Sequence, residues 1–227
     1  KSDLIILAGG VGTRLKSISK GTPKALMQIG NSTFLDLLLK KVFKYEISRI
    51  ILSLCYKPMA FKKHIKNSIY SDKIITVVEP EPLGTGGAIN YVLNQTEISK
   101  TFFVINGDSF SNTNLNQMII DFSNKNFDAM LGISKVKNVK RYGSVSVLND
   151  QIVSFNEKGE EGSGWINNGH YIFKKKVYNH LDGKFSLEND VLANLVKDSG
   201  LGFFKVENDN FIDIGTPYDY KKINKND

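Results

Sequence analysis

Apolar runs bounded by turn residues alternate along the chain with longer segments in which apolar residues recur three and four positions apart. The runs predict strands at residues 3–8, 49–54, 73–79 and 101–106. The longer segments predict helices at residues 32–46, 58–66 and 86–95. Ser32 or Thr33 is a suitable N-cap for the first helix. This alternation is typical of an open, mostly parallel α/β sheet with helices on both faces.

The order of elements loosens after Asp108. The pattern there predicts a helix at 115–124, a strand at 129–134, short strands within 143–155 and at 170–173, and helices at 187–197 and 218–225. No low-complexity linker separates the two parts of the chain. We therefore expect a single domain, 1–227, with a nucleotide-binding half of about 1–110 and a substrate-binding half of about 111–227.

Composition narrows the class of protein. A length of 227 residues with 41% hydrophobic residues is enough for one well-packed core. Lys and Arg number 30 against 23 Asp and Glu, a balance of +7 that suits anionic partners. The basic residues are scattered, which favours solvated helix faces and phosphorylated small molecules over a nucleic-acid groove. With no long apolar run, no secretory-signal pattern and one cysteine, Cys55, we expect a cytoplasmic location without membrane contact.

A glycine-rich loop follows the first strand, in the run LAGGVGTRL from Leu7 to Leu15. Because glycine has no Cβ, its backbone N–H groups can approach a phosphate closely. The dinucleotide-binding pattern would need a glycine where Leu15 stands, and the P-loop pattern is absent. The loop therefore indicates a phosphate site of another kind, although an ordinary strand-ending turn is an alternative.

Two aspartates follow apolar strand-like runs. Asp108 comes after Phe102 to Ile105, and Asp213 after Phe211 and Ile212. Open α/β sheets bind ligands at the carboxyl ends of their strands, so both carboxylates could meet there. Two carboxylates beside phosphate oxygens and water suit Mg²⁺. The alternative is a pair of loop-capping aspartates.

These features together resemble the sugar-1-phosphate nucleotidyltransferase family, whose signature LAGGxGTRL is followed shortly by Pro-Lys. Pro23-Lys24 stands at that place. Further matches continue in the family's order at Gly84 to Ala88, Asn106-Gly107-Asp108, Tyr142-Gly143, Glu157-Lys158, Asn167-Asn168-Gly169 and Asp213 to Pro217. The resemblance implies a Rossmann-like, three-layer α/β/α sandwich of the GT-A-like type, and a Mg²⁺-dependent transfer of a nucleoside monophosphate to a sugar 1-phosphate. Oligomers are common in the family.

The resemblance also implies roles for individual residues. Arg14 and Lys24 would be catalytic. Nucleotide binding falls to Leu7, Ala8, Gly9, Gly10, Gly12, Thr13, Arg14, Lys24, Glu79, Gly84, Thr85 and Asp108. Sugar-phosphate binding falls to Gly107, Tyr142, Gly143, Glu157, Lys158, Asn167, Asn168 and Gly169, and metal binding to Asp108 and Asp213. His64, His170 and His180 show no metal-ligand spacing and receive no catalytic role.

The nucleobase preference depends on Glu79, which stands where the family contacts the base. A carboxylate accepts hydrogen bonds only, which suits the adjacent N1–H and N2 amino group of guanine and predicts GTP. Two alternatives remain: Glu81 contacts the base instead, or Glu79 is an ordinary surface residue.

The compact length and motifs most resemble guanylyltransferases acting on D-glycero-D-manno-heptose 1-phosphate, with mannose 1-phosphate a close competitor. Rival classes are a nucleotide-sensing relative without activity, and a glycosyltransferase, although the chain lacks the Asp-x-Asp motif common in the latter.

Overall fold

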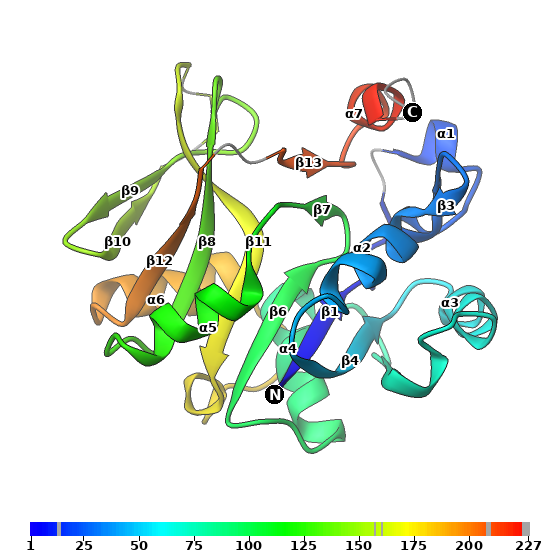
Figure 1. Cartoon of the computed structure of the whole chain (residues 1–227), viewed down its shortest axis with the longest axis horizontal. Coiled ribbons are helices and arrows are strands. Elements are labelled where there is room, and N and C mark those ends of the chain that lie inside the picture. Colours follow the sequence, from blue (N-terminus) through cyan, green and yellow to red (C-terminus); the bar gives the residue numbers. More distant parts are fainter. Residues whose placement is uncertain (13–14, 157, 160, 208–209, 224–227) are drawn as a thin grey trace.

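The computed structural model describes residues 1–12, 15–156, 158–159, 161–207 and 210–223. Its centre is a nine-stranded sheet with the order β5-β4-β1-β6-β11-β8-β12-β10-β9 (Figure 1). These strands are β1 (Ser2–Leu7), β4 (Ile47–Leu54), β5 (Ile74–Val78), β6 (Thr101–Asn106), β8 (Ala129–Val136), β9 (Val145–Leu148), β10 (Gln151–Phe155), β11 (Gly164–Lys174) and β12 (Leu201–Val206). All of them except β11 and β10 run in one direction, as the mostly parallel prediction requires.

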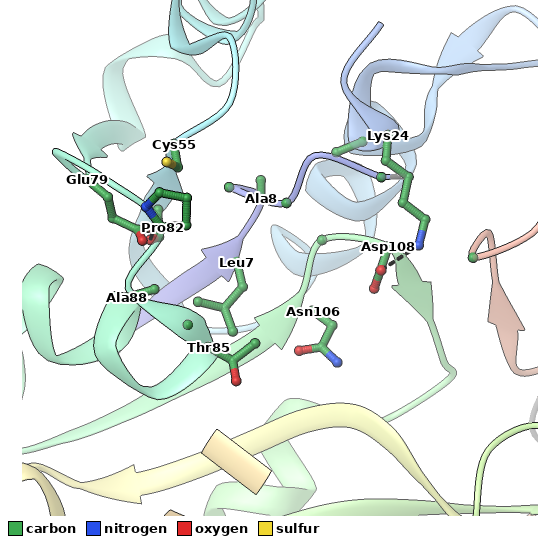
Figure 2. A pocket seen from close by; sticks show the side chains of 18 residues that line it. Leu7, Ala8, Lys24, Cys55, Glu79, Pro82, Thr85, Ala88, Asn106 and Asp108 are labelled. Carbon is green, nitrogen blue, oxygen red and sulfur yellow. Dashed lines mark hydrogen bonds and ion pairs between the residues drawn. The ribbon is translucent and has the colours of Figure 1, made fainter. Parts of the chain in front are cut away.

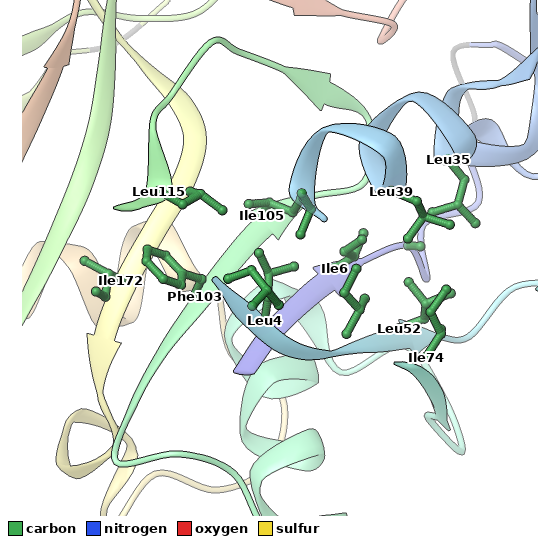
Figure 3. Packing of buried hydrophobic residues seen from close by; sticks show 14 of the residues in the cluster. Leu4, Ile6, Leu35, Leu39, Leu52, Ile74, Phe103, Ile105, Leu115 and Ile172 are labelled. Carbon is green, nitrogen blue, oxygen red and sulfur yellow. The ribbon is translucent and has the colours of Figure 1, made fainter. Parts of the chain in front are cut away.

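Helices cover both faces of the sheet, which confirms the three-layer prediction. One face packs against α2 (Phe34–Val42), α3 (Pro58–Lys66) and α5 (Leu115–Ser123). The other packs against α4 (Gly84–Gln95), a π-helical segment η5 (Leu187–Leu192) and α6 (Ala193–Lys197). Strand β1 shows why. Leu4 and Ile6 pack on the first face (Figure 3). Ile5 packs on the second face, so a strand buried on both sides must be apolar throughout.

Local sequence chemistry sets the start of α2. Thr33 is the N-cap and forms a capping box with Asp36, whose backbone N–H donates to the Thr33 hydroxyl while its carboxylate accepts from the Thr33 backbone N–H. The predicted N-cap is therefore confirmed, but the helix ends at Val42 rather than Glu46. The helix at Pro58–Lys66 and the strand at Thr101–Asn106 have the predicted bounds.

The second half differs more from the prediction. Strand β11 spans eleven residues from Gly164 to Lys174, where only 170–173 was expected, because polar Asn167 and Asn168 hide the apolar pattern. Strand β12 was not predicted at all, although it fills the space between β8 and β10. The expected helix at 187–197 is divided into η5 and α6.

Two short antiparallel pairs lie outside the main sheet: β2 (Gln28–Ile29) with β3 (Ser32–Thr33), and β7 (Ser109–Phe110) with β13 (Ile212–Asp213). The second pair brings a late segment of the chain beside the end of β6 (Figure 1). The Ile214 backbone N–H donates to the Asp108 carbonyl at 3.1 Å. The remaining elements are α1 (Lys16–Ser19), the 3₁₀ turns η2 (Lys24–Leu26), η3 (Ser71–Lys73) and η4 (Lys175–Tyr178), and α7 (Pro217–Ile223).

Among the described residues, no helix has the length and apolar character needed to cross a membrane.

Candidate active site

A cavity of about 400 Å³ opens at the carboxyl ends of β1, β4 and β6. This is the edge at which open α/β sheets bind ligands, and the volume suits a small molecule. Ten of the predicted nucleotide-binding residues line the cavity: Leu7, Ala8, Gly9, Gly10, Gly12, Lys24, Glu79, Gly84, Thr85 and Asp108. Gly107, predicted for the sugar phosphate, lines it too. The other two nucleotide-binding predictions, Thr13 and Arg14, lie outside the described residues.

Two glycines of the cavity allow backbone segments to approach one another. A Cβ on Gly107 would lie 2.6 Å from the Leu7 carbonyl oxygen, and one on Gly9 would lie 3.1 Å from the Cys55 backbone nitrogen. A larger residue at Gly107 would therefore push β6 away from β1. The glycines thus keep the ends of neighbouring strands close together around the cavity.

A lysine and two aspartates form a cluster at one end of the cavity. The Nζ of Lys24 lies 2.6 Å from Asp108 Oδ2 and 3.8 Å from Asp213 Oδ1 (Figure 2 shows the first contact). The three residues come from segments far apart in the sequence. Strand β7 begins directly after Asp108, and it pairs with β13, which ends at Asp213. Burial, followed by the neighbouring charge of Asp108, raises the pKa of Asp213, while Lys24 acts in the opposite direction.

The cluster has the donors that a magnesium ion needs from a protein. Asp108 and Asp213 supply carboxylate oxygens beside the cavity, and the Asp108 side chain is 40% exposed. Across the described chain, no group of three or more His, Cys, Asp or Glu side chains could hold a metal by itself. Two carboxylates without a full protein cage suit Mg²⁺, which keeps water and substrate phosphate oxygens among its ligands.

A buried carboxylate stands at the other end of the cavity. Glu79 is 7% exposed and lines the cavity together with Ser53, Cys55 and Pro82 (Figure 2). Its Oε1 accepts a hydrogen bond from the Ser53 hydroxyl at 3.1 Å, and its Oε2 accepts one from the Leu83 backbone N–H at 3.2 Å. Burial raises the pKa of Glu79, and these two hydrogen bonds oppose that effect. Glu81, the alternative base contact, is exposed and is not part of the lining.

A segment of the second half, around Phe185, packs against the first turn of α4. The Phe185 carbonyl oxygen accepts hydrogen bonds from the backbone N–H groups of Gly86 and Gly87, both at 3.1 Å. A Cβ on Gly84, whose φ is +77°, would lie 2.5 Å from that oxygen. The Thr85 hydroxyl donates to Glu188 Oε2 at 3.0 Å. The two halves are therefore joined by direct hydrogen bonds at the edge of the cavity.

Asn168 requires a correction. Its side chain was predicted to contact the sugar phosphate, but it is 0% exposed and donates to the hydroxyls of Ser111, Thr113 and Ser134. Its amide oxygen accepts from the His170 backbone N–H at 3.2 Å. The side chain therefore holds β11 to neighbouring segments and is not available to a ligand.

Its neighbours lie nearer the cavity. Asn167 donates to the Tyr171 hydroxyl at 2.8 Å and accepts from the Gly169 backbone N–H at 2.8 Å. Gly169 has a φ of +77°, and a Cβ there would lie 2.9 Å from the side-chain nitrogen of Asn106, which lines the cavity. The irregular pairing of β11 with β8 between Asn167 and Tyr171 has the character of a β-bulge, a feature common beside active sites. Burial lowers the pKa of His170 to about 3, so this histidine is neutral.

The other predicted sugar-phosphate residues are not part of the cavity lining. Tyr142 packs edge-on against Phe211, with the ring centroids 5.4 Å apart, and Gly143 has a φ of +76° after it. Lys158 is exposed in the turn after β10, and Glu157 lies outside the described residues. None of Tyr142, Gly143, Lys158, Asn167 and Gly169 lines the cavity.

Several cavity residues were not predicted. They are Ala25, Ser53, Cys55, Pro82, Ala88, Asn106 and Gly215. Ser53 and Cys55 were hidden in an apolar run, but their place at the end of a predicted strand was a usable signal. Cys55 is only partly buried and lines the cavity.

Similarity to known proteins identifies the family of this chain. The family described as Nucleotidyl transferase matches residues 4–227, and the chain belongs to that family. It is therefore a nucleotidyltransferase. Over 95% of its length and 96% of the relative, it is 36% identical to D-glycero-alpha-D-manno-heptose 1-phosphate guanylyltransferase from Campylobacter jejuni.

Two further similarities are close to full length. The enzyme of the same description from Aneurinibacillus thermoaerophilus is 34% identical, with 98% of this chain and 97% of that relative covered. The crystal structure of HddC from Yersinia pseudotuberculosis complexed with GMP-PN has a TM-score of 0.87 and 37% identity, covering 100% of this chain and 99% of that one.

Proposed function

We propose that this protein transfers the guanylyl group of GTP to D-glycero-α-D-manno-heptose 1-phosphate and releases pyrophosphate. The observation that carries the proposal is the arrangement of one cavity, with the Glu79 carboxylate at one end and the Lys24, Asp108 and Asp213 cluster at the other. The first end suits guanine and the second suits a triphosphate. The near full-length similarity to two enzymes described as heptose 1-phosphate guanylyltransferases supports the same substrates.

The guanine assignment rests on hydrogen-bond chemistry. An ionised Glu79 offers acceptors only, and guanine presents two adjacent donors at N1 and N2. Uracil and thymine would place carbonyl oxygens against the negative charge. Because carboxylate oxygens have four lone-pair positions in all, the bonds from Ser53 and Leu83 leave acceptor capacity for the base.

The reaction requires no general base from the protein. A sugar 1-phosphate has a second pKa near about 6, by analogy with phosphoserine, so its oxygens are already nucleophilic at neutral pH. The protein aligns that oxygen with the α-phosphorus of GTP and reduces the repulsion between the two anions. Lys24, together with Arg14, stabilises the charge that moves onto the departing pyrophosphate. Direct attack predicts inversion at the α-phosphorus without a covalent enzyme intermediate.

Asp108 and Asp213 would hold Mg²⁺ in the reacting complex. When bound, the ion would neutralise charge on the phosphate oxygens. Lys24 now contacts both aspartates, so this lysine must share or exchange partners when a triphosphate arrives. Its position lets it move between carboxylate and phosphate oxygens without a change in the backbone.

The sugar is the second part of the proposal. The proposed contacts to the sugar phosphate, as in the matching family motifs, are Gly107, Tyr142, Gly143, Glu157, Lys158, Asn167 and Gly169. Mannose 1-phosphate is the alternative substrate, because it differs from the heptose in length by one carbon.

A pyrophosphate-release assay with five nucleoside triphosphates and two sugar phosphates tests both parts. We expect GTP to exceed UTP, dTTP, CTP and ATP by at least about tenfold in kcat/KM, a difference of about 1.4 kcal/mol. Heptose 1-phosphate should exceed mannose 1-phosphate. A wild-type preference for a pyrimidine triphosphate would refute the guanine assignment, and a strong preference for mannose 1-phosphate would refute the heptose assignment alone.

A further inference from the structure

Ser53 lies behind the carboxylate at the base end of the cavity. It is the next-to-last residue of β4, and it is 1% exposed. Its hydroxyl donates to Glu79 Oε1 at 3.1 Å. The Leu83 backbone N–H donates to the other oxygen at 3.2 Å, so each carboxylate oxygen has one protein donor.

The loop after β1 restricts the space around the same carboxylate. A Cβ on Gly9 would lie 3.1 Å from Glu79 Oε1 and 3.2 Å from the Cys55 Cβ, so the loop after β1 passes close to both side chains. Glu79 itself follows β5, and its backbone N–H donates to the Leu54 carbonyl at 2.8 Å. The carboxylate is thus held from β4, from the loop after β1 and from the turn that leads to α4.

We propose that Ser53 is a positioning residue for nucleobase selection, which fixes the Glu79 carboxylate in the orientation that accepts both guanine donors. This inference rests on the proposed function, because it takes guanine as the base. The Ser53 hydroxyl itself need not touch the nucleotide.

The physical reason is that bidentate recognition needs a fixed plane. A glutamate side chain has three rotatable bonds, and its terminal torsion is broad, so an unheld carboxylate rotates easily. One hydrogen bond to a rotated carboxylate can survive, but two in parallel cannot. Ser53 also favours the ionised form of Glu79, since a hydrogen bond to the charged form stabilises it against burial.

Inosine triphosphate separates the two donors of guanine, because it keeps N1–H and lacks the N2 amino group. We expect the wild-type enzyme to prefer GTP over inosine triphosphate in kcat/KM. Ser53→Ala should raise KM for GTP about tenfold with little change in kcat, and should reduce the GTP to inosine triphosphate ratio several-fold. We expect KM to change rather than kcat because the base is remote from the reacting phosphorus.

Ser99→Ala is the matched control. The Ser99 hydroxyl also donates to a buried carboxylate, that of Asp3, at 3.0 Å. Asp3 lies near the start of β1, away from the cavity. This variant should leave the ratio unchanged. If Ser53→Ala does not fold, Ser53→Cys carries the same test, because a thiol of similar size donates hydrogen bonds only weakly.

A double-mutant cycle identifies the route of the effect. If Ser53 acts through Glu79, Ser53→Ala should have no further effect on the ratio in a Glu79→Ala background, which removes the acceptor of the Ser53 hydroxyl. If Ser53→Ala changes the ratio equally with and without the change at Glu79, Ser53 acts on the base by another path.

The single cysteine of the chain supplies a readout that does not depend on turnover. Cys55 lines the cavity beside Glu79, so bound nucleotide should protect its thiol from alkylation. GTP should protect wild-type Cys55 at about tenfold lower concentration than it protects Ser53→Ala. Burial and the charges of Glu79 and Glu81 raise the pKa of this thiol, so the labelling belongs at mildly alkaline pH.

The outcomes distinguish the inference from the function on which it rests. A wild-type enzyme that selects GTP, together with a Ser53→Ala variant that keeps the wild-type ratio and protection, overturns the role of Ser53 alone. A wild-type enzyme that does not select GTP refutes the guanine assignment, and the role of Ser53 is lost with it.

Discussion

The two ends of the cavity differ in what satisfies their charged groups. At the proposed base end, Glu79 accepts hydrogen bonds from the Ser53 hydroxyl and the Leu83 backbone N–H. At the proposed phosphate end, Lys24 Nζ contacts Asp108 at 2.6 Å and Asp213 at 3.8 Å, and Asp108 also accepts a hydrogen bond from the Ser109 hydroxyl at 3.3 Å. The Glu79 carboxylate is therefore held by neutral donors, whereas Lys24 is paired with carboxylates that an anionic ligand at the proposed phosphate end would have to share.

This difference matches the work required at each end. Selecting a base needs a rigid pattern of acceptors, because a displaced carboxylate would lose discrimination. Transferring a guanylyl group needs a positive charge that can follow the departing pyrophosphate, and the proposed role of Lys24 is to provide it, because its side chain is flexible. Substitutions at the phosphate end should thus reduce turnover, and substitutions at the base end should change nucleotide choice.

The largest effect is expected at Asp108 and Asp213, the two aspartates proposed to bind the metal. Asp213→Asn or Asp108→Asn removes a carboxylate from the proposed Mg²⁺ site, and we expect the Mg²⁺-dependent turnover to be abolished while sugar-phosphate binding survives in part. Pyrophosphate release over a Mg²⁺ titration measures this. Asp72→Asn, in η3 away from the cavity, is the matched control. Wild-type activity of either variant at millimolar Mg²⁺ would exclude that aspartate as a ligand.

Lys24→Ala should have the next largest effect. One charge-assisted contact to the transition state is worth about 2–4 kcal/mol, so kcat should fall by roughly thirty-fold to a thousand-fold. The fold should remain intact by circular dichroism. Lys44→Ala, on the exposed turn after α2, should retain full activity. Retention of more than about a third of wild-type activity by Lys24→Ala would contradict its catalytic role.

Glu79→Gln should change nucleotide choice more than turnover. An amide presents a donor to one of the two guanine donors, so we expect kcat/KM for GTP to fall about tenfold, or about 1.4 kcal/mol, and the preference over UTP to shrink. The neighbouring exposed Glu81→Gln should leave both values unchanged. If Glu81→Gln lowers kcat/KM for GTP and Glu79→Gln does not, Glu81 contacts the base instead.

The smallest expected effect is on stability. Burial raises the pKa of Glu79, so the folded protein binds more protons than the unfolded chain between the two pKa values. Its stability contribution therefore decreases as pH rises through that window, which begins near the usual value of 4.5. Glu79→Gln removes this penalty and should raise the melting temperature relative to wild type more at pH 7 than at pH 4. An equal difference at both pH values would contradict it.

Most residues predicted to bind the nucleotide line the cavity, whereas Gly107 alone does so among the described residues predicted to bind the sugar phosphate. Glu79 and Lys24 follow strong local signals, a strand end and the Pro-Lys pair, and both line the cavity. Asn168 matched the same family pattern, yet it is buried among three hydroxyls. A motif identifies residue types at a site, but it does not tell which of two adjacent amides points inward, because side chains alternate along a strand and the irregular segment in β11 interrupts that alternation.

By itself, the sequence determined the alternation of strands and helices in the first half, the glycine loop after β1 and an N-cap for α2 at Ser32 or Thr33, because these depend on periodicity and capping within a few residues. Only the tertiary structure decided that β12 lies between β8 and β10, that β13 brings Asp213 to Lys24, and that Phe185 closes α4. These contacts join segments far apart in the chain. Their partners are chosen by how the whole core packs, and no local pattern contains that information.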